Sequence, residues 1–294
     1  MIVIDKYKKI TKVLLWIFVA NIVVAAVKLG FGFLLNINSL TADGFHALTD
    51  TFSNVIGIIG IKYASKPADK DHPYGYQKFE TLAGLAIGFL LLRIIIKIVS
   101  NAINWFINPV DLEVSLITII ALGVTILINI FVATYEYRAG KKLKSDVLIS
   151  DSIHTKSDIF ISSGVLVTLI LIKLGLPSII DPILSLIIAV FILKSCYEIF
   201  MMTIEVLVDK MVVDPEEVSR ILEEASDLIL DIHKIRSRGK MDHIFIDLHI
   251  ITRPDLTVRE AHSLSHNLEE RLEEVLGKKV DLVCHIEPDE RNNE

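Results

Sequence analysis

Two short stretches of the sequence carry the same two side chains at the same spacing. The stretch "DGFHALTD" holds His46 and Asp50, and the stretch "DSIHTKSD" holds His154 and Asp158. Residues four apart lie on one face of a helix, one turn above each other, so each stretch can offer an imidazole and a carboxylate to a common point. If the two helices pack together, four nitrogen and oxygen ligands converge, which suits tetrahedral Zn²⁺ or a related divalent ion.

Histidine also links such a site to protons. Its unperturbed pKa of ~6.5 lets a proton compete with a metal for the same ring nitrogen near neutral pH. A site that holds either a metal or protons, and opens to one side at a time, is an antiporter. The alternative for either pair alone is a histidine and an aspartate that hydrogen-bond a neighbouring helix. Because ionisable groups are costly within apolar segments, two matching pairs favour the metal site.

Three further side chains lie near the two pairs in the sequence. Asp43 and Asp151 stand three residues before the histidines, where they either orient an imidazole from outside the site or face water at a helix end. Lys156 lies between His154 and Asp158 but points away from their face, toward headgroups or an acidic partner. The motif HExxH is absent and no glutamate stands as a base beside either pair, which argues against a membrane metalloprotease.

The pairs lie in a chain of apolar blocks. The 294 residues are 52% hydrophobic, with a mean hydropathy of +0.54. The first block is too long for a signal peptide and lacks a small-residue cleavage site, so we expect it to be retained as a span. Lysine and arginine cluster before the first block and after the second and fourth, which predicts that both termini are cytoplasmic. We expect six transmembrane helices, at roughly residues 11–35, 38–63, 79–103, 114–135, 152–174 and 178–204.

The pattern changes after the last apolar block. We expect a transmembrane domain of residues 1–208 and a cytoplasmic domain of residues 209–294, whose helix-strand-strand-helix-strand order predicts an α+β fold with helices on one side of a three-stranded sheet. Residues 210–294 hold 12 Lys/Arg and 20 Asp/Glu, and this acidic balance argues against nucleic-acid binding. Cys196 and Cys284 lack CxxC spacing, so they predict neither a disulfide framework nor a thiolate zinc site.

The motifs together resemble a known family. "SLTADGFHALTD", "DHPYGYQKFETLAGL", "DSIHTKSD" and "DPILSLIIAVFIL" are similar to the cation diffusion facilitator family of divalent-metal/proton antiporters, over essentially the whole chain. The resemblance implies six spans, a ferredoxin- or metallochaperone-like αββαβ tail and a homodimer. It implies that the two HxxxD pairs form the transport site, and two histidines with two aspartates resemble the zinc-preferring members. The transport-site residues are then His46, Asp50, His154 and Asp158.

The loop after the second span resembles the family's second, cytoplasm-facing metal site. Asp69 and His72 match that site in "KPADKDHPYGYQKFE". Tyr76 stands where bacterial zinc members commonly have a histidine, and tyrosine is a poor zinc ligand. Either Asp71 substitutes for it or the loop site is absent.

A dimer contact also follows from the resemblance. Lys78, at the start of the third span, resembles the family's lysine that pairs with an aspartate after the sixth span, here Asp209. In the family this pair locks two protomers together. Lys78 otherwise belongs to the positive belt on the cytoplasmic side.

The tail holds six of the nine histidines. On one predicted strand His249 alternates with Asp247, and on another His285 lies on the same side as Glu287. These residues resemble the family's two-metal site, where metal draws the two tails of the dimer together, although Glu287 replaces the expected aspartate. His243 and His266 have no counterpart. The predicted tail ligands are His233, His249, His262, His285 and Glu287.

The sequence therefore predicts a homodimeric secondary transporter in the cell membrane, not an enzyme. We expect proton-coupled efflux of Zn²⁺ by alternating access, with Zn²⁺ also acting as a regulator and membrane lipids as surroundings. Nothing reads GxxxxGK[ST], which leaves the proton gradient as the driver. One alternative is an antiporter for Fe²⁺, Mn²⁺, Cd²⁺, Co²⁺ or Ni²⁺. The other is a membrane-anchored metal sensor, although an anchor does not need His and Asp at bilayer depth.

Overall fold

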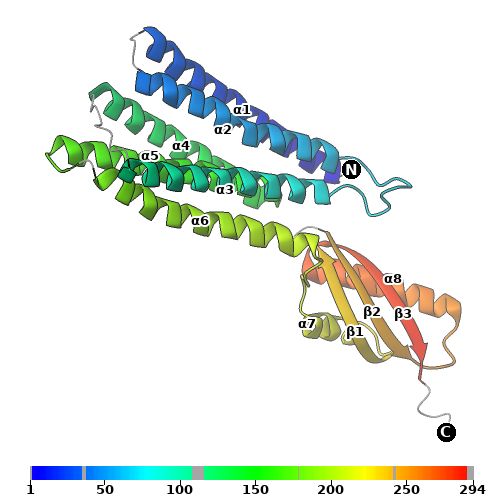
Figure 1. Cartoon of the computed structure of the whole chain (residues 1–294). Helices are drawn as coiled ribbons and strands as arrows, with labels where there is room; N and C mark the ends of the chain where they lie inside the picture. Colours follow the sequence, from blue (N-terminus) through cyan, green and yellow to red (C-terminus); the bar gives the residue numbers. More distant parts are fainter. Residues whose placement is uncertain (1, 35–37, 108–115, 178, 241–242, 290–294) are drawn as a thin grey trace. The chain divides into compact units, whose positions relative to one another are not determined.

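The computed structural model describes residues 2–34, 38–107, 116–177, 179–240 and 243–289 (Figure 1). The side chains of residues 2–5, 28, 31–34, 38–46, 49, 50, 117, 118 and 181 lie outside this description. The chain divides into two compact units, Met1–Ile204 and Glu205–Glu294, here called the membrane unit and the tail unit. The two units divide within the last turn of the helix Ile180–Leu207, and the predicted domain boundary, between residues 208 and 209, lies just after that helix.

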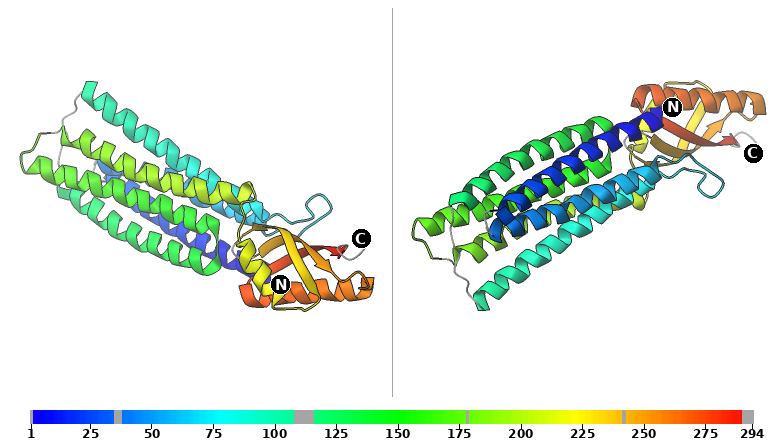
Figure 2. Two further views of the ribbon diagram at one scale, coloured as in Figure 1. Left: turned by 90° about the horizontal axis from the view of Figure 1, so that it is seen from below. Right: turned by 90° about the horizontal axis from the view of Figure 1, so that it is seen from above.

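The membrane unit is a bundle of long helices that run side by side (Figure 2). By length and composition, five helices of the described part are long and apolar enough to cross a membrane. The 27-residue helix α2 lies in the same bundle and brings its number of long helices to six. The predicted helical membrane domain is thereby confirmed. The helices are α1 (Ile2–Leu34), α2 (Asn38–Ala64), α3 (Lys78–Ile107), α4 (Leu116–Leu143), α5 (Asp146–Lys173) and α6 (Ile180–Leu207).

The packing of these helices suits an apolar solvent. Large apolar side chains such as Trp16, Leu127 and Val190 are about two-thirds exposed, at 65%, 68% and 67%, as a lipid-facing surface requires. Inside, small residues let backbones approach: a Cβ built on Gly60 of α2 would lie only 2.3 Å from the Cβ of Ala83 on α3. Buried apolar side chains join α1, α2, α3 and α5 in one cluster and α3 with α6 in another.

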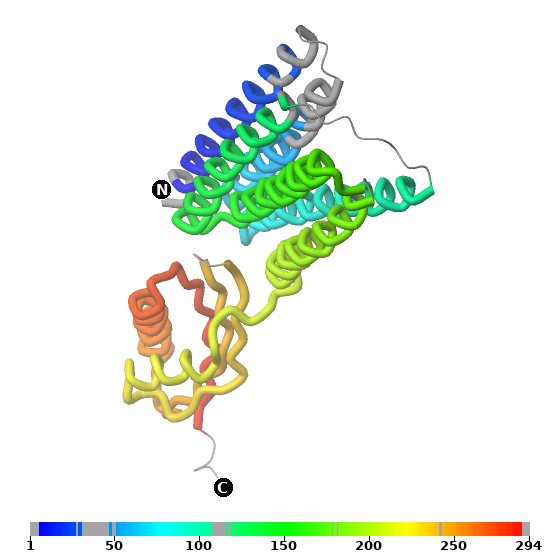
Figure 3. The backbone as a smooth tube through the Cα atoms, turned by 90° about the vertical axis from the view of Figure 1, so that its left-hand side faces the viewer, coloured from blue at the N-terminus to red at the C-terminus, as the bar shows by residue number. Residues whose placement is uncertain are grey.

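The tail unit has the predicted αββαβ order (Figure 3). Its sheet has the order β1-β2-β3, with β1 and β2 antiparallel and β2 and β3 parallel. Alternate residues of β2 are buried, and they join apolar residues of both helices in one core, which leaves the other face of the sheet for polar side chains. The elements are α7 (Pro215–Glu223), β1 (Ile229–Gly239), β2 (His243–Thr252), α8 (Val258–Leu276) and β3 (Lys279–Pro288).

Local sequence signals set the ends of both tail helices. Asp214 caps α7 by accepting a hydrogen bond from the backbone N–H of Glu216. Thr257 and Glu260 form a reciprocal capping box at the start of α8. Gly277 ends α8 with a φ of 61°, a left-handed conformation that glycine adopts without steric cost.

Candidate metal centres

The membrane unit buries a histidine whose ring is not hydrogen-bonded. His154 of α5 is 3% exposed, and neither Nδ1 nor Nε2 has a hydrogen-bond partner among the described residues. A buried polar group without a partner carries a free-energy penalty, and the usual exceptions serve catalysis or hold an ion. Asp158 follows one turn later on the same face of α5 and is half-buried. The arrangement fits an imidazole kept available for a metal.

Helix α2 packs against α5 next to this histidine. The side-chain amide of Asn54 donates a hydrogen bond to Oδ2 of Asp151, and both residues are almost completely buried. The amide of Asn21 on α1 donates to Oδ1 of Asn54 at 3.1 Å. Further along, a Cβ on Gly57 would lie 3.0 Å from Cγ1 of Val147. As the residue number rises along α2 it falls along α5, so the two helices are antiparallel at this contact.

This register relates the second HxxxD pair to the first. One helical turn back from Asn54 along α2 is Asp50, and one turn onward from Asp151 along α5 is His154. One more turn in the same direction reaches His46 on α2 and Asp158 on α5. The side chains of His46, Asp50 and Asp43 lie outside the described residues.

The tail unit aligns three histidines across its sheet. His233, His249 and His285 are register partners on β1, β2 and β3, on the face opposite the core. The ring centroids of His233 and His249 are 5.4 Å apart, and those of His249 and His285 are 4.6 Å apart. Strand pairing therefore brings together side chains that lie up to 52 positions apart in the sequence.

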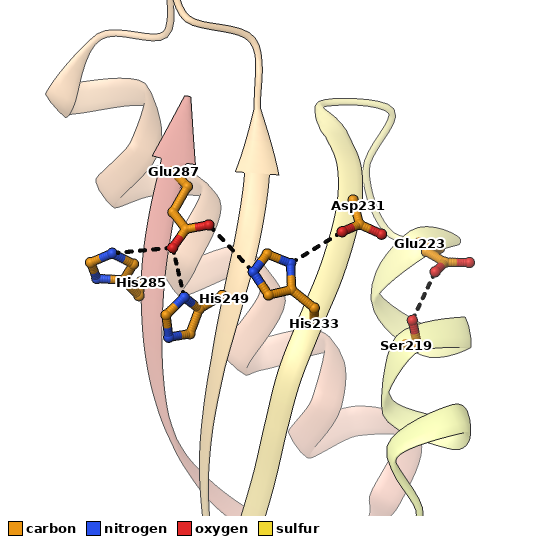
Figure 4. Close-up of polar contacts among 7 residues, drawn as sticks. All are labelled: Ser219, Glu223, Asp231, His233, His249, His285 and Glu287. Carbon is orange, nitrogen blue, oxygen red and sulfur yellow. Dashed lines mark hydrogen bonds and ion pairs between the residues drawn. The ribbon is translucent and has the colours of Figure 1, made fainter. Parts of the chain in front are cut away.

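Glu287 lies at the centre of this row (Figure 4). Its Oε1 is 2.8 Å from Nδ1 of His249 and 3.5 Å from Nε2 of His285, and its Oε2 is 3.3 Å from Nε2 of His233. The hydrogen bond from His249 is the main reason why the pKa of Glu287 is lowered. On the far side, Nδ1 of His233 lies 3.1 Å from Asp231. This contact fixes the ring as an outer partner does at a metal site.

These contacts define a potential metal site. Among the described residues, His233, His249 and Glu287 form the one group of three or more whose ligand atoms all lie within 4.8 Å of one another. Ligand bonds of ~2.0–2.2 Å to zinc are reached from there by small side-chain rotations. His285 adds a third imidazole beside Glu287 and is 66% exposed.

His262 does not join this row within one chain. It lies on α8, where its ring packs edge-on against His266 with the centroids 4.6 Å apart. Nδ1 of His266 in turn lies 3.6 Å from Glu269. His262 as a metal ligand stays a prediction.

The loop after α2 is closed by its own hydrogen bonds. Oδ1 of Asp69 accepts from the backbone N–H groups of Asp71 and His72, and Oδ2 accepts from the Tyr76 hydroxyl at 2.7 Å. The Tyr76 hydrogen bond is the main cause of the lowered pKa of Asp69, and it raises the pKa of Tyr76. The ring of His72 is tilted by 30° against that of Tyr76 with the centroids 4.1 Å apart, so the loop holds its shape through Tyr76. The loop metal site stays a prediction.

The predicted dimer pair spans the two units. Lys78 begins α3 in the membrane unit, and Asp209 belongs to the tail unit. Within the tail unit, Asp209 lies 3.5 Å from Arg238. The pairing of Lys78 with Asp209 stays a prediction.

Sequence reasoning missed Glu136, and it left open whether Asp151 orients an imidazole or faces water; the structure buries Asp151 completely. Glu136 falls outside the predicted fourth span, but α4 continues to Leu143 and buries it completely. The fifth helix likewise begins at Asp146, six residues before the predicted block, so Asp151 lies inside a helix. A helix extends past its apolar block when polar side chains face other helices. The signal that was available is the isolated acid in "ATYEYRAG".

Comparison with known proteins defines the class. Residues 14–208 match the cation efflux transmembrane domain, and residues 201–289 match the cytoplasmic domain of cation efflux proteins. The chain therefore belongs to the cation efflux, or cation diffusion facilitator, family of divalent-metal transporters, and it is a multi-pass membrane protein.

Relatives cover nearly the whole chain. It is 32% identical over 269 residues to the uncharacterized transporter MJ0449 of Methanocaldococcus jannaschii, with 90% of this chain and 94% of that protein aligned. It is 27% identical to the manganese efflux system protein MneS of Bacillus subtilis, with 92% of each aligned. It is 28% identical to the cadmium, cobalt and zinc/H(+)-K(+) antiporter of B. subtilis, over 82% of this chain and 78% of that protein.

Proposed function

We propose that this protein exports Zn²⁺ in exchange for protons through a site formed by His46, Asp50, His154 and Asp158. The observation that carries the proposal is the buried ring of His154, whose two nitrogens have no hydrogen-bond partner among the described residues. Two imidazoles and two carboxylates make a tetrahedral donor set that suits Zn²⁺.

The packing of α2 on α5 supports this ligand set. The Asn54–Asp151 hydrogen bond and the close approach of Gly57 to Val147 fix an antiparallel register. Successive turns from that contact lead to the two HxxxD pairs, so the four ligands lie at neighbouring levels of two adjoining helices. The carboxylates then balance the charge of a divalent cation inside a bundle where an isolated charge is costly.

Proton exchange follows from the ligand chemistry. Imidazole binds either Zn²⁺ or a proton near neutral pH, so filling the site with metal displaces protons. One relative is named an antiporter of cadmium, cobalt and zinc for H⁺ and K⁺, which agrees with this exchange. Another is named for manganese efflux, so Mn²⁺ is the competing cargo that a test has to include.

The tail row is proposed as a regulatory zinc site. His233, His249 and Glu287 supply the ligands, with His285 beside them. We further propose that the protein is a homodimer in the cell membrane. Since the match to the cytoplasmic domain of cation efflux proteins covers residues 201–289, we place this unit and both termini in the cytoplasm. The basic residues of the loops beside α2 and α4 agree with that orientation.

Metal flux in proteoliposomes tests the transport function. With an imposed pH gradient, wild-type protein is expected to move Zn²⁺ together with protons in the opposite direction, and Asp50→Ala and Asp158→Ala are expected to move none. Mn²⁺, Fe²⁺, Co²⁺ and Cd²⁺ are tested in parallel. Flux of another metal alone would keep the antiporter and overturn zinc as the cargo. Normal zinc flux through Asp158→Ala would overturn the assignment of the site.

A further inference from the structure

A second acidic group lies buried beside the proposed transport site. Glu136 of α4 is completely buried, and its Oε2 lies 3.0 Å from the hydroxyl of Thr155 on α5. That hydroxyl also lies 3.1 Å from the backbone carbonyl of Asp151, in its own helix. A hydroxyl has one proton to donate. Thr155 can therefore donate to only one of these two acceptors at a time, and Oε2 of Glu136 receives no proton from it whenever the carbonyl of Asp151 does.

Asp151 faces Glu136 from the neighbouring helix. It is also completely buried, and its Oδ2 accepts a hydrogen bond from Asn54. Glu136 and Asp151 lie within hydrogen-bond reach of each other. Oε1 of Glu136 and Oδ1 of Asp151 are buried and have no donor among the described residues. Ionised carboxylates only accept hydrogen bonds, so a bond between the two requires a proton on one of them.

The surroundings of Glu136 and Asp151 also favour one proton on the two carboxyl groups. Among the side chains that the structure describes, the other charged or titratable groups that act on the pair are His154 and Asp158, both on α5. Helix α2 adds the neutral side chains of Ser53 and Asn54, and α1 reaches Asn54 through Asn21. None of these is a permanent cation. Two buried carboxylates without a cation are not both ionised, because each charge raises the cost of the other.

We propose that Glu136 and Asp151 form an acid pair that binds one exchangeable proton beside the metal ligands. The inference rests on the proposed function, since the proton matters only in a metal/proton exchanger. When the cation binds, its positive charge favours loss of the shared proton to the side that faces the metal supply. When the cation leaves, the pair takes up a proton from the opposite side. The pair thereby carries one proton in each cycle, without itself ligating the metal.

Infrared difference spectroscopy on the reconstituted full-length protein tests the proton directly. Wild-type protein at neutral pH is expected to show the C=O stretch of a protonated, buried carboxyl, which weakens when Zn²⁺ is added. Glu136→Gln keeps an oxygen for Thr155 and is expected to lose this band, as is Asp151→Asn. Glu217→Gln is the matched control, because it removes an exposed carboxylate from α7 of the tail unit and leaves the band in place. Thermal melting and gel filtration check that each variant is folded.

Flux measurements separate this pair from the transport site. Glu136→Gln is expected to bind Zn²⁺ with an affinity within a few-fold of wild type but to lose most of the flux that a pH gradient drives. A wild-type response to the gradient in both Glu136→Gln and Asp151→Asn would overturn the proposal, as would a band that survives in both. Absence of any metal flux in wild-type protein would overturn the antiporter itself, and with it the exchange role of the pair.

Discussion

His154 and His249 are both proposed metal ligands, but they lie in opposite surroundings. His154 is 3% exposed and its ring has no hydrogen-bond partner among the described residues. The side chain of His249 is 24% exposed and donates to Glu287 at 2.8 Å. At the proposed membrane site the ring of His154 is therefore left without a hydrogen bond, at a cost in free energy, whereas at the proposed tail site His249 and Glu287 already satisfy each other.

The difference suits the two proposed sites to different functions. A cation that enters the membrane unit removes the desolvation penalty of the buried ligands, so binding there is coupled to the state of the helices around it. A cation at the tail has to displace contacts that already exist, and water stays close. The first arrangement suits a cargo that passes through, and the second suits a ligand whose concentration is sensed.

Removing one histidine from each site is the strongest test of this comparison. His154→Ala is expected to reduce pH-driven zinc flux by about 100-fold or more, because even the loss of an outer partner costs a metal site about 10- to 100-fold in affinity. His249→Ala is expected to reduce the flux only a few-fold. Zinc flux in proteoliposomes measures both. Equal losses in the two variants would contradict the division of work between the sites.

A substitution at the contact between α2 and α5 tests whether the register of these helices positions the proposed membrane ligands. Leucine at Gly57 has to displace Val147, because even a Cβ there lies 3.0 Å from its side chain. We expect Gly57→Leu to lower zinc affinity at the membrane site by about 10-fold, or about 1.4 kcal/mol. Gly123→Leu is the matched control, since a Cβ at Gly123 of α4 meets nothing within 4 Å. Competition binding measures the zinc affinity of the two full-length variants. Similar affinities would show that the register of α2 on α5 does not position the membrane ligands.

The same two regions differ in how far the sequence predicts them. The tail was predictable element by element, because capping residues such as Asp214 and Gly277 and strict alternation on β2 are local signals. The row of His233, His249 and His285 needed the strand register, which sequence spacing does not supply.

In the membrane unit the apolar blocks gave the helices but not their ends. Glu136 and Asp151 lay outside the predicted blocks, because hydropathy does not distinguish a polar turn facing water from one facing another helix. The HxxxD spacing still singled out His154 and Asp158 as candidate ligands, since a period of four residues is itself a helical signal. Their role as metal ligands stays a prediction. Which polar side chains lie beside His154 depends on how the helices pack, and sequence spacing does not show that.

The titration of Glu287 sharpens the description of the tail site. His249 lowers the pKa of Glu287, so their contact stabilises the metal-free tail above the ordinary glutamate pKa of ~4.3 and is lost as the pH falls through the lowered value. His249→Ala is expected to raise the pKa of Glu287 back toward the ordinary value, as measured by NMR of the carboxyl carbon. His266→Ala, on α8, serves as the control and is expected to leave that pKa unchanged. A similar shift in both variants would place the cause elsewhere.

The smallest expected effect lies in the loop after α2. The Tyr76 hydroxyl lowers the pKa of Asp69, and this contact helps to hold the loop until the pH falls through that lowered pKa. Tyr76→Phe is expected to raise the pKa of Asp69 toward ~3.9 and to leave zinc flux near that of wild type, since the loop keeps its two backbone hydrogen bonds to Asp69. NMR titration beside Tyr74→Phe, a matched change in the same loop, isolates the contact. A large loss of flux in Tyr76→Phe alone would show that the loop takes part in transport, and the comparison of two metal sites would then have to include a third.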